Sequence, residues 1–194
     1  MGVSAATKAA HPTCAADDTP SLCLQRRLTH GQQNESSATG VHLGILAPRC
    51  RLLDVGSLPA LDPTTTVLLF PDDCAVPADS VDASLTDVVV IDSKWGQAKG
   101  VVEHPALRGI RHVRLGAYRT SYWRYHTKGV PDDGLCTVEA VYFLCRELHA
   151  RRHPPGEPCA CMDDLMWYFA FQHRRVHAAS DARIAKRSAQ LEGR

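Results

Sequence analysis

The chain has 194 residues, 22% of them charged, and a formal net charge of +1. This length suffices for one domain with a hydrophobic core. The near-zero net charge excludes a protein that is polycationic overall, so any nucleic-acid surface has to be a local patch. No run of 18 apolar residues is present, which argues against a membrane span. The first 28 residues lack an apolar signal-peptide core, so we expect an intracellular protein, cytoplasmic or nuclear.

Residues 1–28 are low in large apolar side chains, and we predict a loose N-terminal segment there. A domain at 29–178 and a polar tail at 179–194, expected to fray, complete the predicted organisation. Predicted strands lie at His42–Ala47, Cys50–Val55, Thr64–Phe70, Asp87–Ile91 and Arg111–Leu115. Predicted helices run from Pro77 or Ala78 to Leu85, and over Ser93–His104, Leu135–Ala150 and Met162–Val176. Apolar runs alternating with helices predict a single α/β domain, a mostly parallel sheet flanked by helices.

A carboxylate follows the apolar run Val88–Ile91 at once. In open α/β sheets, ligands bind just beyond the carboxyl ends of strands, so Asp92 is well placed for chemistry. The alternative is structural, because a strand-terminal Asp often only caps a turn. Both interpretations stay open at this point.

The 28 residues from His104 to Pro131 contain six Arg or Lys residues, three histidines and no acidic residue. Half of the eight Tyr and Trp residues of the chain lie in the same stretch. Cations that meet phosphates beside aromatic faces that stack on unpaired bases suit single-stranded or looped RNA. The alternative is that the aromatics belong to the core and the cations are merely solvated. The candidate RNA-binding residues are Arg111, Arg114, Arg119, Tyr122, Trp123, Arg124 and Lys128.

Several motifs of other enzyme classes are absent from the sequence. There is no G-x-G-x-x-G after a strand, no Walker A sequence and no G-x-S-x-G elbow, which argues against dinucleotide oxidoreductases, P-loop enzymes and α/β hydrolases. The eight cysteines contain no C-x-x-C pair, so we predict reduced thiols and no metal site. A thiol-dependent or metal protein built on Cys159 and Cys161 is kept as an alternative.

The stretch Asp92-Ser93-Lys94-Trp95 is similar to the D-x-T-W signature of the DTW-domain family, the tRNA-uridine aminocarboxypropyltransferases. Further segments resemble that family in the same order, and particularly the branch typified by DTW domain-containing protein 1. These are His30 with Asn34-Glu35, His42–Pro48, Leu69-Phe70-Pro71, Tyr118–Arg124, Pro131-Asp132 and Leu135–Ala140. The resemblance covers about His30 to Phe171, most of the chain.

Three departures from the family pattern stand out. Lys94 replaces the Thr of the signature, which removes a hydroxyl and adds a cation. His30 is separated from Asn34-Glu35 by Gly31-Gln32-Gln33, so this segment aligns only with an insertion. The N-terminal cysteine-pair zinc module common in the family is missing.

The resemblance implies a SPOUT-like fold with a C-terminal trefoil knot, whose threaded part is Arg111 to Glu139. It also implies transfer of the 3-amino-3-carboxypropyl group of S-adenosyl-L-methionine to N3 of a tRNA uridine, with Asp92 as the candidate general base. The donor is expected to contact Phe70, Pro71, Asp92, Leu115, Leu135, Thr137 and Glu139. An RNA methyltransferase and a catalytically decayed RNA-binding protein are the alternatives. The expected partner is tRNA and no membrane is expected, while the oligomeric state stays open.

Overall fold

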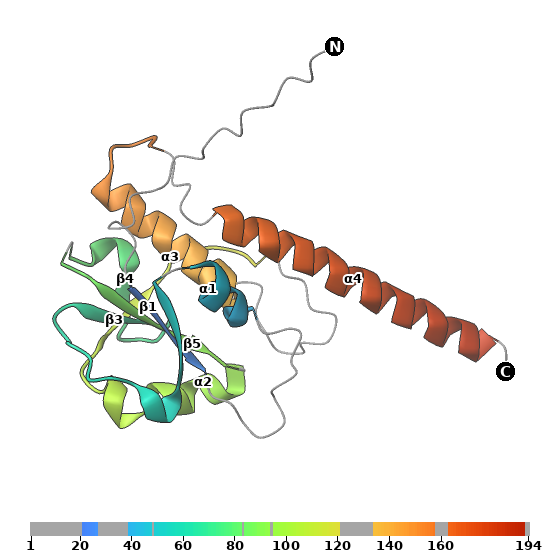
Figure 1. Ribbon diagram of the computed structural model, residues 1–194, viewed down its shortest axis with the longest axis horizontal. Coiled ribbons are helices and arrows are strands. Elements are labelled where there is room, and N and C mark those ends of the chain that lie inside the picture. The colour runs from blue at the N-terminus through green and yellow to red at the C-terminus, as the bar shows by residue number, and fades with distance from the viewer. Residues whose placement is uncertain are drawn as a thin grey trace, which may run out of the picture.

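Within the part of the chain that the structure describes, the sheet has six strands, and all of their pairings are parallel. The computed structural model describes residues 21–26, 39–47, 49–82, 84–93, 95–120, 134–157 and 163–192. The strands follow the order β2-β1-β5-β3-β6-β4 (Figure 1). Their bounds are β1 Ser21–Arg26, β2 Cys50–Asp54, β3 Thr66–Leu69, β4 Val76–Pro77, β5 Asp87–Asp92 and β6 Arg111–Arg114. The predicted single α/β domain with a parallel sheet is therefore confirmed.

Strand β5 lies inside the sheet, between β1 and β3. Its valines are buried on both faces, as expected for the continuous apolar runs of parallel strands. Val88 and Val90 pack into the larger core cluster, whereas Val89 packs into the smaller one on the other face. Because side chains alternate along a strand, Asp92 falls on the same face as Val88 and Val90.

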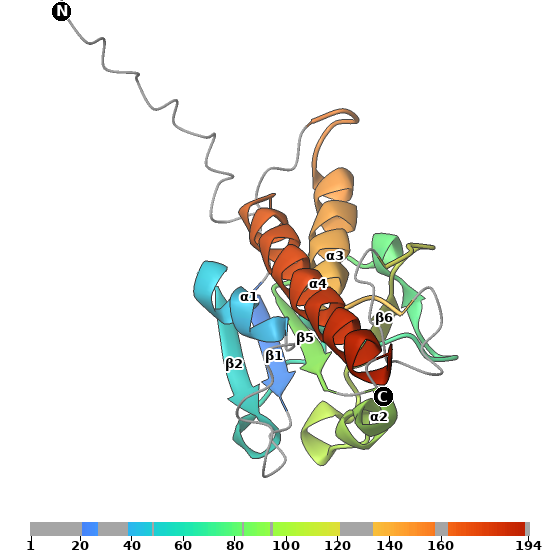
Figure 2. The same cartoon turned by 90° about the vertical axis from the view of Figure 1, so that its right-hand side faces the viewer.

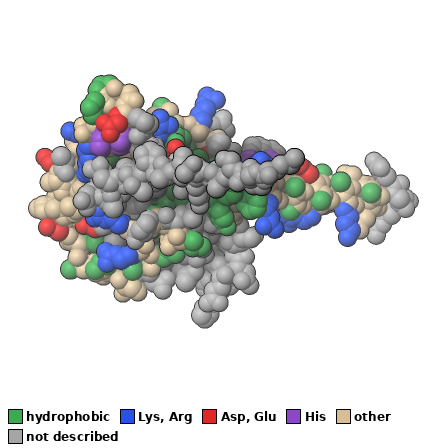
Figure 3. Space-filling model, turned by 45° about the horizontal axis from the view of Figure 1, so that its top comes forward, with side chains coloured by type: hydrophobic (Ala, Val, Ile, Leu, Met, Phe, Trp, Pro, Cys, Tyr) green, Lys and Arg blue, Asp and Glu red, His purple; other side chains and the backbone are tan. Residues whose placement is uncertain are grey.

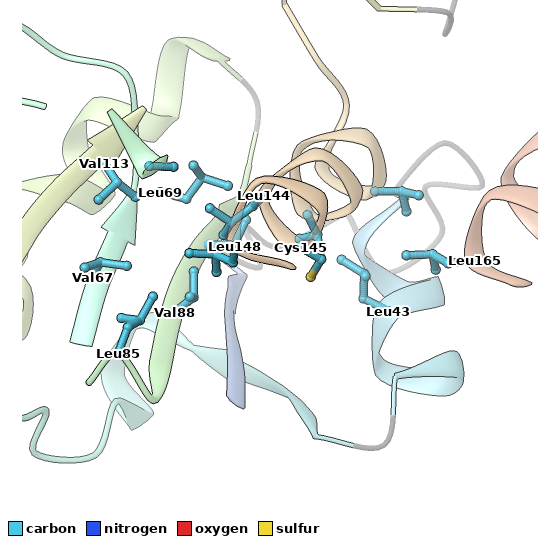
Figure 4. Close-up of a cluster of buried hydrophobic side chains, with 14 of the residues drawn as sticks. Leu43, Val67, Leu69, Leu85, Val88, Val113, Leu144, Cys145, Leu148 and Leu165 are labelled. Atoms are coloured by element: carbon cyan, nitrogen blue, oxygen red, sulfur yellow. The ribbon is translucent and has the colours of Figure 1, made fainter. Parts of the chain in front are cut away.

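Three helices cover the larger core: α1 (Gly40–Leu46), α3 (Thr137–Arg152) and α4 (Asp163–Glu192). Leu144, Cys145 and Leu148 of α3 lie between the strand side chains and Leu43 and Leu165 of α1 and α4 (Figure 4). Figure 2 shows the three helices together over one face of the sheet. Helix α3 is thus the central element of this layer.

The opposite face is covered by α2 (Trp95–Val102) and the 3-10 helix η3 (Pro105–Leu107). Leu68, Val89, Leu107 and Ile110 form its buried cluster, against which Phe70 packs. The sheet is therefore covered on both faces, as the alternating sequence pattern predicts.

The strand predicted at His42–Ala47 is wrong, because this segment lies within helix α1 up to Leu46, and Ala47 is the C-cap of that helix. Leu43 is fully buried, and Ala47, four residues later, is also buried, whereas Ile45 is 74% exposed. Burial at a spacing of four is helical. A short apolar run does not distinguish a strand from a helix by itself, and here the packing against α3 and α4 decides.

Two further predictions near the start of the domain need correction. The predicted loose segment 1–28 contains β1, which pairs with both β2 and β5. This pairing is made with distant residues and leaves little trace in a local sequence of six residues. The helix predicted up to Leu85 is reduced to the two-residue strand β4 and the 3-10 helix η2 (Ala78–Ser80).

The C-terminal residues are polar and exposed where their side chains are described, but they do not form a separate tail, because α4 continues as one helix from Asp163 to Glu192. Its second half, residues 178–192, contains five Ala and no Gly or Pro, so helix propensity favours continuation. The helix projects well beyond the sheet (Figure 1). Neither α4 nor any other helix in the described ranges is long and apolar enough to cross a membrane.

Candidate functional site

Asp92 ends strand β5 and is half-buried. Its Oδ1 accepts a hydrogen bond of 2.8 Å from Oγ1 of Thr137, 45 residues later in the chain. Thr137 is the first residue of α3. The contact therefore joins the carboxyl edge of the sheet to a helix N-terminus, where the helix dipole favours a carboxylate.

The first turn of α3 is closed by a capping box built on Cys136 and Glu139. The backbone N–H of Cys136 donates to Oε2 of Glu139 at 3.0 Å, and Oγ1 of Thr120 donates to the same oxygen at 2.8 Å. Glu139 is 1% exposed, so its carboxylate is buried with these partners. Burial, together with the nearby Glu139 charge, raises the pKa of the Cys136 thiol to about 12. The thiol is therefore neutral at physiological pH and acts as a cap.

Residues 116–120 follow β6, bend at Ala117 and run along α3. The segment contacts three residues of α3, namely Glu139, Phe143 and Glu147. They are spaced by four and so share one face of the helix. Gly116 N donates to Glu147 Oε1 at 2.9 Å, and the ring of Tyr118 stacks on Phe143 at 3.9 Å. Burial, with Glu147 nearby, raises the pKa of Tyr118.

This segment runs antiparallel to α3, because Gly116 contacts the later residue Glu147 and Thr120 contacts the earlier residue Glu139. It therefore delivers exposed Arg119 to the N-terminus of α3, the end at which Thr137 holds Asp92. The start of the basic, aromatic stretch and the strand-end carboxylate thus converge on one end of one helix.

The predicted donor-binding residues do not all lie on one face. Asp92, Thr137 and Glu139 gather at the N-terminus of α3, and Leu115 packs against the same core. The ring of Phe70 instead packs into the cluster on the opposite face, edge-on to His112. The N–H of Phe70 donates to Val113 O at 3.0 Å, and Pro71 has no N–H to offer.

Of the signature, Asp92 and Ser93 are both half-buried, and Trp95 begins α2. Lys94 lies outside the described residues, as do His30, Asn34-Glu35, Cys159 and Cys161. Leu135 precedes α3 and is half-buried.

The candidate RNA-binding residues are divided between two edges of the sheet. Arg114 ends β6 at the carboxyl edge, and Arg119 follows it on the segment along α3. Arg111 begins β6, at the opposite edge, where its charge acts on Asp82. Tyr122, Trp123, Arg124 and Lys128 lie outside the described residues.

Sequence reasoning missed Thr120, Phe143 and Glu147, which position the segment along α3. The spacing of 139, 143 and 147 on a predicted helix was the available signal, since it places all three on one face. This spacing does not show which segment of the chain contacts that face of the helix.

Comparison with known proteins matches residues 28–177 to the DTW domain. The chain belongs to the DTW-domain family. This DTW protein is 33% identical over 98 residues to tRNA-uridine aminocarboxypropyltransferase 1 of Xenopus tropicalis, which covers 49% of the chain and 32% of the relative. The corresponding protein of Rattus norvegicus is 35% identical over 95 residues, covering 49% and 31%.

A second type of relative is tRNA-uridine aminocarboxypropyltransferase 2 of Drosophila melanogaster, which is 36% identical to this DTW protein over 95 residues. That match covers 47% of the chain and 37% of the relative. The chain thus spans about a third of the length of the curated relatives it matches. No solved structure matches this DTW protein.

Proposed function

We propose that this DTW protein is a tRNA-uridine aminocarboxypropyltransferase that uses S-adenosyl-L-methionine as donor substrate and modifies N3 of a tRNA uridine. The observation that carries the proposal is the convergence of Asp92, Thr137 and the segment ending at Thr120 on the N-terminus of α3. The family membership and the names of the relatives support the same reaction.

Asp92 is proposed as the general base. Uridine N3 carries a proton and is a poor nucleophile until that proton is removed. The carboxylate takes the N3 proton, N3 bonds to the side-chain carbon next to the sulfonium, and the carbon–sulfur bond electrons stay on sulfur as 5′-methylthioadenosine leaves. The donor supplies an activated leaving group, so positioning provides most of the remaining catalysis. Thr137 Oγ1, which donates to Oδ1, leaves Oδ2 of Asp92 for the base.

The donor is proposed to lie between the carboxyl edge of the sheet and the first turn of α3. The polar groups present there fit a zwitterionic ligand, because the N-terminus of a helix favours a carboxylate and Asp92 favours an ammonium or sulfonium. Leu115 and Leu135, both half-buried, offer apolar surface to adenine. The backbone of Phe70 and Pro71 can offer the donor its carbonyl oxygens, since the N–H of Phe70 already donates to Val113 O.

The RNA is proposed to bind over Arg114 and Arg119 and to extend toward α4. Exposed Lys and Arg side chains lie along α4 where it leaves the body of the molecule and beyond (Figure 3). The exposed cations described on this helix are Arg174, Arg175, Arg183 and Lys186. Trp167 is 66% exposed and stacks on Phe171 with ring centroids 5.9 Å apart. Exposed aromatic faces beside cations suit unpaired bases beside phosphates.

The finer fold assignment is part of the same proposal. We place this domain among SPOUT-like folds with a C-terminal trefoil knot, whose threaded part is Arg111 to Glu139. Its support is the path of 116–120, which leaves β6 and runs along α3 toward that helix's own N-terminus. Only the family resemblance argues for the threading itself.

The test is incubation of the full chain with S-adenosyl-L-methionine and unmodified tRNA, followed by mass spectrometry of the nucleosides. The expected product is 3-(3-amino-3-carboxypropyl)uridine, formed together with 5′-methylthioadenosine. Methylated nucleoside with S-adenosylhomocysteine would identify a methyltransferase instead. Binding of tRNA without donor binding or product would identify an RNA-binding protein that has lost catalysis.

A further inference from the structure

We infer that His149, His153 and Glu157 form a divalent transition-metal site, with zinc as the metal that suits them best. One ligand atom from each of the three residues lies within 4.8 Å of the other two. Among the described residues, no other group of three His, Cys, Asp or Glu side chains has its ligand atoms this close together. The space-filling view shows histidine side chains beside acidic ones at one end of the molecule (Figure 3).

The distances fall close to those of a metal site. Nδ1 of His153 lies 3.0 Å from Oε1 of Glu157, and the imidazole rings of His149 and His153 stack with centroids 3.9 Å apart. Tetrahedral zinc with nitrogen and oxygen ligands at about 2.0–2.2 Å places neighbouring ligand atoms about 3.3–3.6 Å apart. Because the in-plane lone pairs of stacked rings do not converge, one imidazole turns out of the stack when all three ligand atoms, now within 4.8 Å of one another, meet at a single ion.

An unsatisfied polar atom supports the same inference independently. Nε2 of His149 is buried and has no hydrogen-bond partner. A buried polar atom without a partner costs about 1–3 kcal/mol, so such atoms normally have a ligand, a water or a neighbour. A metal ion bound to this nitrogen removes that cost.

The sequence places these three residues together for identifiable reasons. His149 and His153 are four residues apart at the end of α3, hence on one face. The intervening Arg151 and Arg152 are directed elsewhere, donating to the backbone carbonyls of Asp79, Val81 and Leu85. A turn closed by Glu157 N donating to Pro154 O at 3.1 Å, with Gly156 at φ +91, returns Glu157 toward the histidines.

Two imidazoles and one carboxylate are the ligand set of zinc sites that keep a fourth position for water. The site is distinct from the proposed reaction centre. His149 follows Thr137 by twelve residues, about 18 Å along the helix. Its role is to fasten the end of α3 to the connection that leads to α4.

The experiment is titration of the chelator-treated full chain with zinc chloride by calorimetry. One ion per chain is expected, and His149→Ala and Glu157→Gln are each expected to weaken binding by about 100-fold or more. Saturating zinc is expected to raise Tm by about 5 °C. If His149→Ala does not fold, Glu157→Gln, a surface substitution, still gives the test.

The chain contains a matched control. His173 and His177 have the same spacing on α4, but no described Asp or Glu completes a three-ligand group with them. The double variant His173→Ala/His177→Ala is expected to bind zinc like the parent. Equal loss in this control, or no saturable binding in the parent, would overturn the site. Thiolate-to-metal charge-transfer bands after cobalt substitution would also overturn it, since they would show cysteine ligands.

Discussion

Asp92→Asn separates the proposed base from the structural contact that the same side chain makes. The asparagine Oδ1 still accepts from Thr137 Oγ1, so the 2.8 Å hydrogen bond is kept but loses its charge. Hydrogen bonds to charged groups contribute about 1.5–3 kcal/mol and neutral ones about 0.5–1.5 kcal/mol. The half-buried site thus predicts a loss of about 1 kcal/mol in the free energy of unfolding. Removal of a general base predicts a fall in kcat of about 100- to 10,000-fold.

The rate is measured as modified nucleoside formed per unit time at saturating S-adenosyl-L-methionine and tRNA, and stability by urea denaturation. Thr137→Val is the control, because it removes the hydroxyl and keeps the carboxylate. This control is expected to lose a similar free energy of unfolding and to act mainly on the KM for the donor. A kcat near that of the parent in Asp92→Asn, or equal kcat losses in both variants, would refute the assignment of Asp92 as the base.

Four further predictions concern α3. Glu139→Ala is expected to lower the free energy of unfolding, measured in urea, by about 2 kcal/mol, because it leaves buried donors unsatisfied. Glu147→Ala removes an exposed hydrogen bond and should lower the free energy of unfolding by less than about 1 kcal/mol. Alkylation followed by peptide mass spectrometry should modify Cys136 at least about 100-fold more slowly than exposed Cys74. Since the pKa of Cys136 is raised from 9.0 to about 12, its contribution to stability is complete below pH 9 and should decline between pH 9 and 12. Leu144→Ala is expected to cost about 3 kcal/mol, and an unchanged Tm would contradict its place in the core.

Most of the sheet was predictable because its strands carry continuous apolar runs. Thr66–Leu69 and Asp87–Asp92 are buried on both faces, and such runs are recognisable without knowledge of their partners. Strand Ser21–Arg26 depends on pairing with two strands that follow later in the chain. Helix α1 depends on burial of Leu43 beneath α3 and α4, which a seven-residue sequence does not disclose.

The sequence predicted several polar residues of the candidate site, but it did not predict all of the contacts between them. The positions of Asp92 at the end of a strand and of Thr137 in the first turn of a helix could be read from the pattern, and the structure joins them by a hydrogen bond. That Thr120 reaches Glu139 could not be read, because it depends on the path of a long connection. The prediction of no metal site was based on cysteine spacing and on the interpretation that His-x-x-x-His zinc spacing is missing. That interpretation is wrong, because His149 and His153 have this spacing.

Packing against the rest of the domain stabilises one part of the thirty-residue helix α4 more than the other. Leu165 and Phe169 are buried in its first two turns, whereas every side chain described from Ala178 onward is exposed. A helix of about 15 residues without packing is only marginally stable in water. Amide hydrogens along α4 should therefore exchange with deuterium in a graded series, slowest near Phe169 and fastest toward Glu192. Bound nucleic acid would flatten that gradient from its fast end.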